Sequence, residues 1–362
     1  MNVAYKKKNK TQETKEKILS WIRLGELKDG DCLLPEPQLA RKFGVSIITV
    51  RRALKELEQN NSIKRVQGRG TFITHKTGSG PHPRFVKLLT PIETSQIPQN
   101  NFFLREIVKG VKDGMYDSQN NLDLLCDFFY DREPPVQEYI AGIIGLMLPP
   151  ETWSQILKTA PPDIPKIAIH YVPEFTDLNI SGIKIDNVHG GYIAVKHLIE
   201  HGHKNIGILI AEDSPDTMIR YEGYKKALEM YNICHNRDLV ATCKLNDADS
   251  ISTVRNLIAS NPSMTAVFMP GYYLAKNVIT AIEAESLEIP QDISLVGYDD
   301  LASGDFEKKG ITTVKQPLEE MGCLAANMMT GMLEGGSVTV NSLTLLRPQL
   351  IVRNSVKKLE VQ

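Results

Sequence analysis

Residues 33–73 read LLPEPQLARKFGVSIITVRRALKELEQNNSIKRVQGRGTFI, and this stretch decides the fold of the N-terminal part of the chain. After Pro35, apolar residues recur at helical spacing until Gly44 ends the pattern. Ser46 then stands at the expected N-cap of a second helix, since its hydroxyl can accept a hydrogen bond from a free backbone amide. That helix carries one apolar face, formed by Val50, Leu54 and Leu57. Two helices joined by a tight glycine-containing turn predict a helix-turn-helix.

A hairpin is expected directly after these helices. In residues 62–73 two short apolar strands flank the turn Gly68-Arg69-Gly70. Glycines let such a tip approach a phosphate backbone closely, and Arg69 supplies a charge that can enter a minor groove. With a further helix over residues 13–25, the pattern predicts a winged helix-turn-helix domain spanning residues 1–74.

The net charge of −1 conceals a strong asymmetry along the chain. Residues 1–78 hold 17 Lys and Arg against 8 Asp and Glu, a net charge of +9. The remainder holds 25 basic against 35 acidic residues, a net charge of −10. A small basic module joined to a larger acidic one indicates that one end binds a polyanion. A solvated lysine tail is the alternative, but it explains only the lysines before residue 11 and not the later arginines.

The cysteines and the apolar runs indicate a cytoplasmic protein. Five cysteines are scattered without a CxxC pair, which favours reduced thiols over a disulfide framework or a zinc site. No signal-peptide pattern follows the N-terminal lysines. The most apolar run, Ile140–Leu148, is far shorter than the ~20 residues that span a bilayer. We therefore expect no membrane partner.

Residues 75–85 are rich in Gly, Ser and Pro, which predicts a linker. Beyond it, strand-like apolar runs occur at 86–89, 122–126, 142–147, 167–169, 206–210, 266–269 and 294–297. Helical patterns lie between them, at 102–117, 190–201, 219–232, 249–260, 273–285 and 317–334. This alternation predicts an α/β domain with parallel sheets over residues 86–356.

The number of strand–helix units predicts two lobes in this domain, because it exceeds one Rossmann half. The expected first lobe covers about 86–185 and 314–340, and the second about 186–313 and 341–356. In such folds ligands bind beyond the carboxyl ends of the strands, which here means the cleft between the lobes.

Residues from Thr14 to Ile73 resemble the GntR-type winged helix almost throughout. The resemblance implies binding to double-stranded operator DNA. It places these residues on the recognition helix: Ser46, Ile47, Thr49, Arg51 and Arg52. It places these on or beside the wing: Lys64, Gln67, Gly68, Arg69 and Gly70.

Two positions depart from the GntR pattern. Ile47 stands where an arginine is common, and Pro35 stands where a Ser or Thr usually precedes the helix. The isoleucine removes a base or phosphate contact and can instead meet a thymine methyl group. For Arg51 and Arg52 the alternative to a DNA contact is an ordinary solvated helix face.

The C-terminal part resembles LacI/GalR-type effector domains, whose fold is that of periplasmic sugar-binding proteins. The matching stretches are NFFLREIVKGV (101–111), IKIDNVHGGYIAVKHLIEHGHKNIGIL (183–209), RYEGYKKAL (220–228), IPQDISLVGYDD (289–300), ITTVKQPLEEMG (311–322) and RPQLIVRNS (347–355). A GntR-type head on a LacI-type sensor is similar to the arrangement of arabinose repressors of Gram-positive bacteria. The resemblance implies a homodimer that binds a small carbohydrate-like effector and needs no cofactor.

The same resemblance places Arg220 and Asp299 in the effector cleft, where a planar donor fork and an acceptor suit vicinal hydroxyls. Their alternative role is a structural salt bridge across the lobes. Phe102 and Phe103 fall where an aromatic ring stacks on the ligand, or else belong to the core.

Two further cleft positions depart from the family. His170 replaces a common Asp, and Gly271-Tyr272 replaces an Asn-Asp pair, so that two acceptors become an imidazole and a phenol. We therefore expect the effector to be a different carbohydrate, an acidic sugar or a phosphorylated sugar, to which a charged His170 can donate.

No metal site is expected. His197 and His201 are spaced i, i+4 on a helix with His203 nearby, but the family pattern HLIEHGH accounts for all three.

The sequence thus predicts a transcriptional regulator, a repressor of carbohydrate uptake or catabolism genes, that its effector releases or re-tunes. The first alternative is a solute-binding receptor of the same fold without a role on DNA. The second is an α/β enzyme acting on a sugar, which no catalytic motif supports.

Overall fold

The computed structural model describes residues 10–23, 27, 30–59, 62–66, 69–73, 84–92, 101–117, 122–128, 140–173, 180–244, 250–300, 305–334 and 341–360. The chain divides into an N-terminal unit, Met1–Phe85 with Asp131–Ile140, and a larger unit formed by Val86–Tyr130 and Ala141–Gln362.

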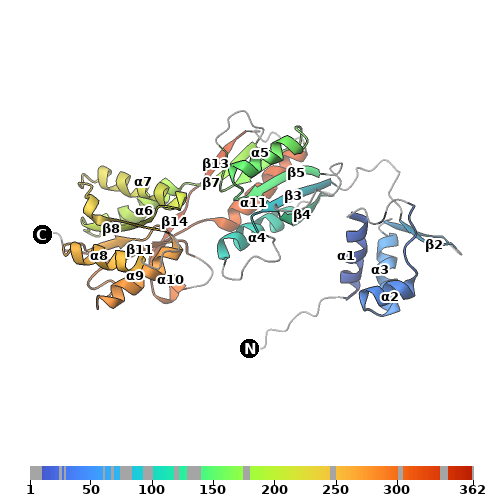
Figure 1. The fold of residues 1–362 in the computed structure, drawn as a ribbon, viewed down its shortest axis with the longest axis horizontal. Helices are drawn as coiled ribbons and strands as arrows, with labels where there is room; N and C mark the ends of the chain where they lie inside the picture. The colour runs from blue at the N-terminus through green and yellow to red at the C-terminus, as the bar shows by residue number, and fades with distance from the viewer. Residues whose placement is uncertain are drawn as a thin grey trace. The chain divides into compact units, whose positions relative to one another are not determined.

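The N-terminal unit is the predicted winged helix (Figure 1). Its elements are α1 (Lys10–Arg23), α2 (Glu36–Phe43), α3 (Ile47–Gln59), β1 (Ile63–Val66) and β2 (Gly70–Ile73). The two strands pair antiparallel, and a bridge between Cys32 and Phe72 adds a third segment beside them. One apolar cluster holds helices and hairpin together, with Ile18, Leu39, Val50, Leu54, Leu57, Ile63 and Ile73 at its centre.

Local chemistry fixes the turn between the two helices, as the sequence predicts. Gly44 adopts a left-handed φ of 64° that a residue without a Cβ tolerates, and its N–H bonds the carbonyls of Ala40 and Arg41. Ser46 caps α3, since its Oγ accepts the backbone N–H of Thr49 at 3.1 Å.

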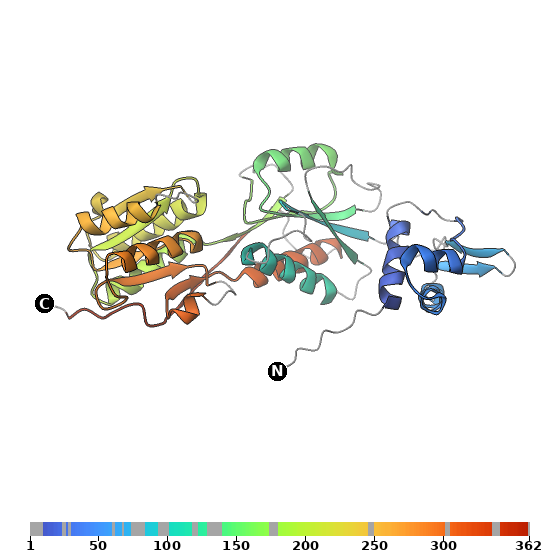
Figure 2. The ribbon, with the colours of Figure 1, turned by 60° about the horizontal axis from the view of Figure 1, so that its bottom comes forward.

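The larger unit contains two six-stranded sheets, each covered by helices on both faces (Figures 1 and 2). We call the first lobe the sheet of order β13-β7-β6-β5-β3-β4 with its helices. Its strands are β3 (Arg84–Thr90), β4 (Leu122–Phe128), β5 (Ile140–Leu146), β6 (Lys166–Ile169), β7 (Ile180–Ile185) and β13 (Leu343–Leu346). Helices α4 (Phe102–Asp117) and α11 (Leu318–Leu333) pack on one face, and α5 (Pro150–Thr159) covers the other (Figure 2).

The second lobe has the sheet order β14-β12-β11-β10-β8-β9. Its strands are β8 (Ile206–Ala211), β9 (Val240–Cys243), β10 (Ala266–Phe268), β11 (Ser294–Tyr298), β12 (Thr312–Lys315) and β14 (Gln349–Ile351). Helices α6 (Asn187–Glu200) and α7 (Pro215–Met230) cover one face, and α8 (Ser250–Ser260) and α9 (Tyr272–Ala284) cover the other (Figure 1). The lobe also contains the short helix α10 (Asp305–Lys308) and a 3₁₀ turn, η2 (Arg237–Leu239), directly before β9. The expected α/β class with two lobes is confirmed.

One expected boundary is wrong. Residues 341–356 are expected in the second lobe, but β13 pairs parallel with β7 in the first lobe and only β14 joins the second-lobe sheet. The chain therefore passes between the lobes three times, after β7, after β12 and after β13. The sequence of a four-residue edge strand does not indicate which strand it pairs with. The passage between the lobes after β13 therefore cannot be predicted from the sequence alone.

Within the described ranges, the structure contains neither a membrane-spanning helix nor a metal site. None of the helices in them is long and apolar enough to cross a membrane. In the same ranges, no three or more His, Cys, Asp or Glu side chains gather as a metal site.

Candidate functional site

An exposed polar face runs along α3 and the hairpin of the N-terminal unit. Arg52 on α3, Lys64 on β1 and Arg69 in the turn are exposed. Gly70 begins β2 with a φ of 121°, which favours glycine. Gln67 and Gly68, the other two predicted wing residues, lie outside the described residues.

The Arg51 side chain is not an unpaired cation on the exposed face of α3, because its guanidinium forms an ion pair. Its Nε and Nη2 both donate to Oε2 of Glu36, at 3.0 and 2.9 Å. The other oxygen of Glu36 lies 3.6 Å from Arg65. Glu36, to which the sequence assigns no role, therefore holds the guanidinium of Arg51 against the start of α2.

In the larger unit a cavity of about 350 Å³ is lined by residues from both lobes. It contains all six residues that the sequence analysis assigns to the effector: Phe102, Phe103, His170, Arg220, Tyr272 and Asp299. Phe102 and Phe103 begin α4, and the ring of Phe103 meets that of His170 edge-on, with centroids 5.0 Å apart.

Strand ends supply three of the cavity residues. Met147, His170 and Asp299 directly follow β5, β6 and β11, and each has a left-handed φ, of 53°, 75° and 70°. Non-glycine residues rarely adopt this conformation, and those that do cluster at ligand sites. The turn at each strand end redirects the side chain into the cavity wall.

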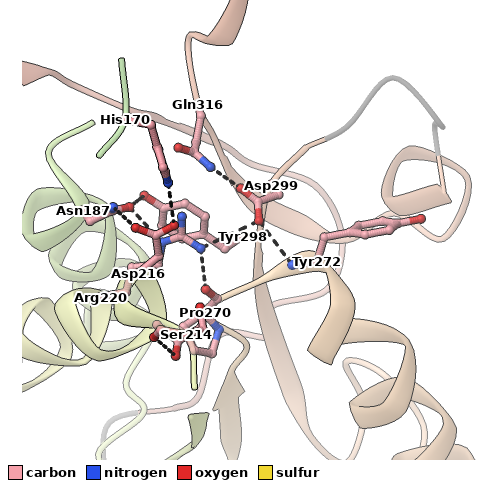
Figure 3. Close-up of polar contacts among 11 residues, drawn as sticks. His170, Asn187, Ser214, Asp216, Arg220, Pro270, Tyr272, Tyr298, Asp299 and Gln316 are labelled. Atoms are coloured by element: carbon pink, nitrogen blue, oxygen red, sulfur yellow. Dashed lines mark hydrogen bonds and ion pairs between the residues drawn. The ribbon is translucent and has the colours of Figure 1, made fainter. Parts of the chain in front are cut away.

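Arg220 lies at the centre of a buried hydrogen-bond network (Figure 3). Its Nε donates to Asn187 Oδ1 at 2.9 Å and its Nη1 to the carbonyl of Pro270 at 2.7 Å. The guanidinium also lies 3.7 Å from the ring centroid of Tyr298, whose hydroxyl donates to the same Asn187 oxygen at 3.1 Å. Arg220 is 3% exposed, so its planar donor set is fixed by neighbours on three sides.

Asp299 faces Arg220 within the second lobe. Its Oδ2 lies 3.7 Å from Arg220 Nη1 and accepts the backbone N–H of Tyr272 at 3.3 Å, while its Oδ1 accepts from Gln316. The ion pair considered in the sequence analysis is therefore present, but it does not cross the lobes, because α7 and β11 belong to the same lobe.

Tyr272 enters the network differently from the expectation. Its backbone amide contacts Asp299, whereas its ring is directed away from the other labelled side chains (Figure 3) and packs 5.5 Å from the Phe306 ring.

Asp216, at the start of α7, joins the two lobes. Its Oδ2 lies 3.0 Å from His170 Nε2 of the first lobe, and its Oδ1 accepts from Asn187 Nδ2 at 3.1 Å. Burial by itself would raise the pKa of Asp216, but His170, Arg220 and Asn187 together hold it below its ordinary value. Sequence reasoning misses Asp216 and Asn187, although the Ser-Pro-Asp at 214–216 is typical of a helix start.

The family comparisons agree with this architecture. Residues 10–73 match the model of bacterial regulatory proteins of the gntR family, and residues 195–356 match the model of the periplasmic binding protein-like domain. The chain thus carries a segment that matches the gntR family at its N-terminal end and a periplasmic binding protein-like domain after it.

Among curated relatives, the arabinose metabolism transcriptional repressor of Geobacillus stearothermophilus is 27% identical over 362 residues, 96% of this chain and 97% of the relative. The HTH-type transcriptional repressor PurR of Histophilus somni strain 2336 is 26% identical, over 89% of this chain and 98% of the relative. The arrangement shared with the arabinose repressor is the one that the sequence predicts.

Solved structures show the same fold. The transcriptional regulator CelR in complex with cellobiose aligns with a TM-score of 0.61 and 20% identity, over 89% of this chain and 100% of that one. A LacI family regulator from Enterococcus faecium with bound ribose aligns with a TM-score of 0.58 and 22% identity, over 76% of this chain and 100% of that one.

Proposed function

We propose that this chain is a cytoplasmic, DNA-binding transcriptional repressor without enzymatic activity, whose two-lobed domain senses a small carbohydrate-like molecule. The observation that carries the proposal is the combination of an exposed basic face on a winged helix with a fixed Arg220–Asp299 pair in a cavity. In helix-turn-helix proteins the N-terminal residues of the second helix contact base edges in the major groove. Here those residues begin at Ser46, and the ten DNA contacts expected from the sequence remain our assignment.

The cavity chemistry favours an uncharged carbohydrate over an acidic or phosphorylated one. The charged side chains among its described lining residues are Arg220, Asp216 and Asp299, so carboxylates outnumber guanidinium groups. His170, the donor expected from the sequence for an anionic sugar, has its Nε2 3.0 Å from Asp216 Oδ2. Aromatic rings from Phe102 and Phe103 supply the apolar surface on which a sugar ring can stack. The names of relatives that mention arabinose, cellobiose and ribose make these sugars the first candidates.

The proposed mechanism is a population shift in a homodimer. An effector that contacts both lobes stabilises one lobe arrangement, and two paired copies transmit this to the spacing of their winged helices. Only a difference in effector affinity between the two arrangements can drive the change. We propose that effector binding relieves repression.

The function is tested in two steps. A duplex selected by the full chain from a random library should bind with an affinity that falls steeply with salt, because phosphate contacts release counterions. A thermal-shift and calorimetry screen of neutral, acidic and phosphorylated pentoses, hexoses and disaccharides should then find a ligand that weakens this complex. Absence of selective DNA binding would favour the alternative, a solute-binding receptor. If a phosphorylated sugar bound tightly to wild type but not to the His170→Ala variant, an anionic effector would be favoured over an uncharged one.

A further inference from the structure

An exposed isoleucine stands at the start of the recognition helix. Ile48 is 63% exposed and the neighbouring Ile47 is 42% exposed, although both are large apolar side chains. They are the first two residues of α3, directly after the Ser46 cap. A single exposed isoleucine is unremarkable on a protein surface, but this pair lies at the helix end that a helix-turn-helix inserts into the major groove.

Helix geometry decides which way Ile48 faces. Val50, Leu54 and Leu57 are at most 1% exposed and define the side of α3 that packs on the core. Residues three, four and seven positions apart share a helix face, so Ile48 lies on the face of Arg51, Arg52 and Lys55. All three cations are exposed. Ile48 is therefore the apolar end of a basic stripe that faces away from the core.

The surroundings of Ile48 select its partner. A stable protein–protein interface buries roughly 800 Å² on each partner. One isoleucine flanked by cations offers far less apolar surface than that. A basic stripe is instead complementary to DNA phosphates. Within the major groove, the apolar group that base pairs present is the 5-methyl group of thymine. Because the Arg51 guanidinium donates to Glu36, Ile48 and Arg52 are exposed side chains of this turn that are not held by that ion pair.

We propose that Ile48 recognises a thymine through its 5-methyl group, and so makes one operator position specific for thymine. This inference rests on the proposed DNA-binding function and adds to it a residue and a base. Ile47 is less exposed and stands closer to the core face, so it contributes less to this contact.

Replacing thymine by deoxyuridine tests the proposal, because it removes the methyl group and keeps the base pairing. A duplex selected by the full chain from a random library is resynthesised with deoxyuridine at each thymine in turn, and binding is followed by fluorescence anisotropy. At one thymine position in each half-site, the substituted duplex should bind wild type about fourfold more weakly, the factor expected for one lost methyl contact. Ile48→Ala should bind the thymine and uracil forms of that duplex equally, whereas Ile48→Val, which keeps two methyl groups, should still distinguish them.

Three results would overturn the inference. The first is that wild type binds every uracil-substituted duplex as tightly as the parent, and the second is that Ile48→Ala keeps the full discrimination. A chain that selects no duplex at all would remove the proposed function together with this inference, whereas the first two results leave DNA binding intact. Thermal denaturation of both variants provides the folding control, and their midpoints should match wild type because the side chain is exposed.

Discussion

His170 Nε2 and Asp216 Oδ2 lie 3.0 Å apart and join the first lobe to the second. His170 directly follows β6 and is buried, whereas Asp216 belongs to the first turn of α7. Both residues line the cavity, so the contact forms part of its wall. A molecule bound in this cavity lies beside a hydrogen bond that joins the lobes, and its binding has to preserve or replace that bond.

We predict that the His170–Asp216 pair contributes about 1–3 kcal/mol to the stability of the larger unit. In a double-mutant cycle with His170→Ala and Asp216→Ala, the two substitutions should be less costly together than the sum of the separate effects. Chemical denaturation measures the free energy of unfolding of each variant. Additive effects would show that the contact contributes nothing measurable.

A second prediction concerns Arg220. Arg220→Lys keeps the charge but loses the planar fork that reaches Asn187 and Pro270. We expect effector binding to weaken at least about tenfold and stability to fall by about 2–3 kcal/mol, because a buried network loses its donor. Calorimetry with the effector found in the screen measures the first effect.

Arg353→Lys is the matched control for Arg220. Arg353 makes a two-point contact with Asp300, at 2.9 Å for both pairs of atoms, outside the residues that line the cavity. Its replacement should lower stability and leave effector affinity unchanged. If both variants lost effector binding equally, the loss would reflect the fold of the second lobe and not a contact with the ligand.

The sequence predicts the elements better than it predicts the contacts between them. The amphipathic pattern over 102–117 coincides with α4, since a helix is determined by residues close in sequence. Two of the six predicted effector residues, His170 and Asp299, directly follow strands, whose carboxyl ends the topology brings together. The other four come from α4, α7 and α9. The contact of Asp216 with His170 cannot be predicted from the sequence, because the two residues are 46 positions apart and no local pattern connects them.

Tyr272 and β13 show two other limits of the sequence. A residue type states which side chain is present but not whether its side chain or its backbone amide faces the site, as Tyr272 illustrates. For β13, the apolar residues of a short edge strand fit either sheet, so that only the pairing with β7 assigns it to the first lobe.

A third prediction tests the close packing of α6 on α7. A Cβ on Gly191 would lie 2.0 Å from the backbone oxygen of Arg220, so Gly191→Ala must separate the two helices. We expect a loss of about 3 kcal/mol or more, with weaker effector binding, because the Arg220 backbone moves. Gly271→Ala is the control, since its Cβ would meet nothing closer than 3.8 Å at an extended φ of −176°. Equal midpoints for the two variants in thermal denaturation would contradict this account.

A fourth prediction concerns Arg51 on DNA. Arg51→Ala should weaken binding to the selected duplex by about 1–3 kcal/mol and relax base choice, if the guanidinium leaves Glu36 to contact a base. Glu36→Gln should then strengthen binding or leave it unchanged, because it releases the same guanidinium. Gel-shift titration of both variants decides between this role and a solvated helix face. Unchanged affinity for Arg51→Ala would assign the arginine to the ion pair with Glu36 alone.

The last prediction concerns acid stability and rests on His197. Its ring is buried beside His201, and Nε2 has no hydrogen-bond partner among the described residues. Burial and the neighbouring histidines lower the pKa of His197 from 6.5 to about 4. Between these values the unfolded chain takes up a proton that the folded chain does not. The contribution to stability is therefore complete above pH 6.5 and falls as the pH drops, by up to about 3 kcal/mol near pH 4.

His197→Leu removes this titration and the unpartnered nitrogen together. The variant should gain stability relative to wild type as the pH falls from 7 to 5, measured by chemical denaturation at each pH. Burial also lowers the pKa of His203, so the variant keeps part of the acid sensitivity. Parallel stability curves for variant and wild type would mean that His197 takes up its proton equally in the folded and unfolded chain, and that its buried position has no effect on acid stability.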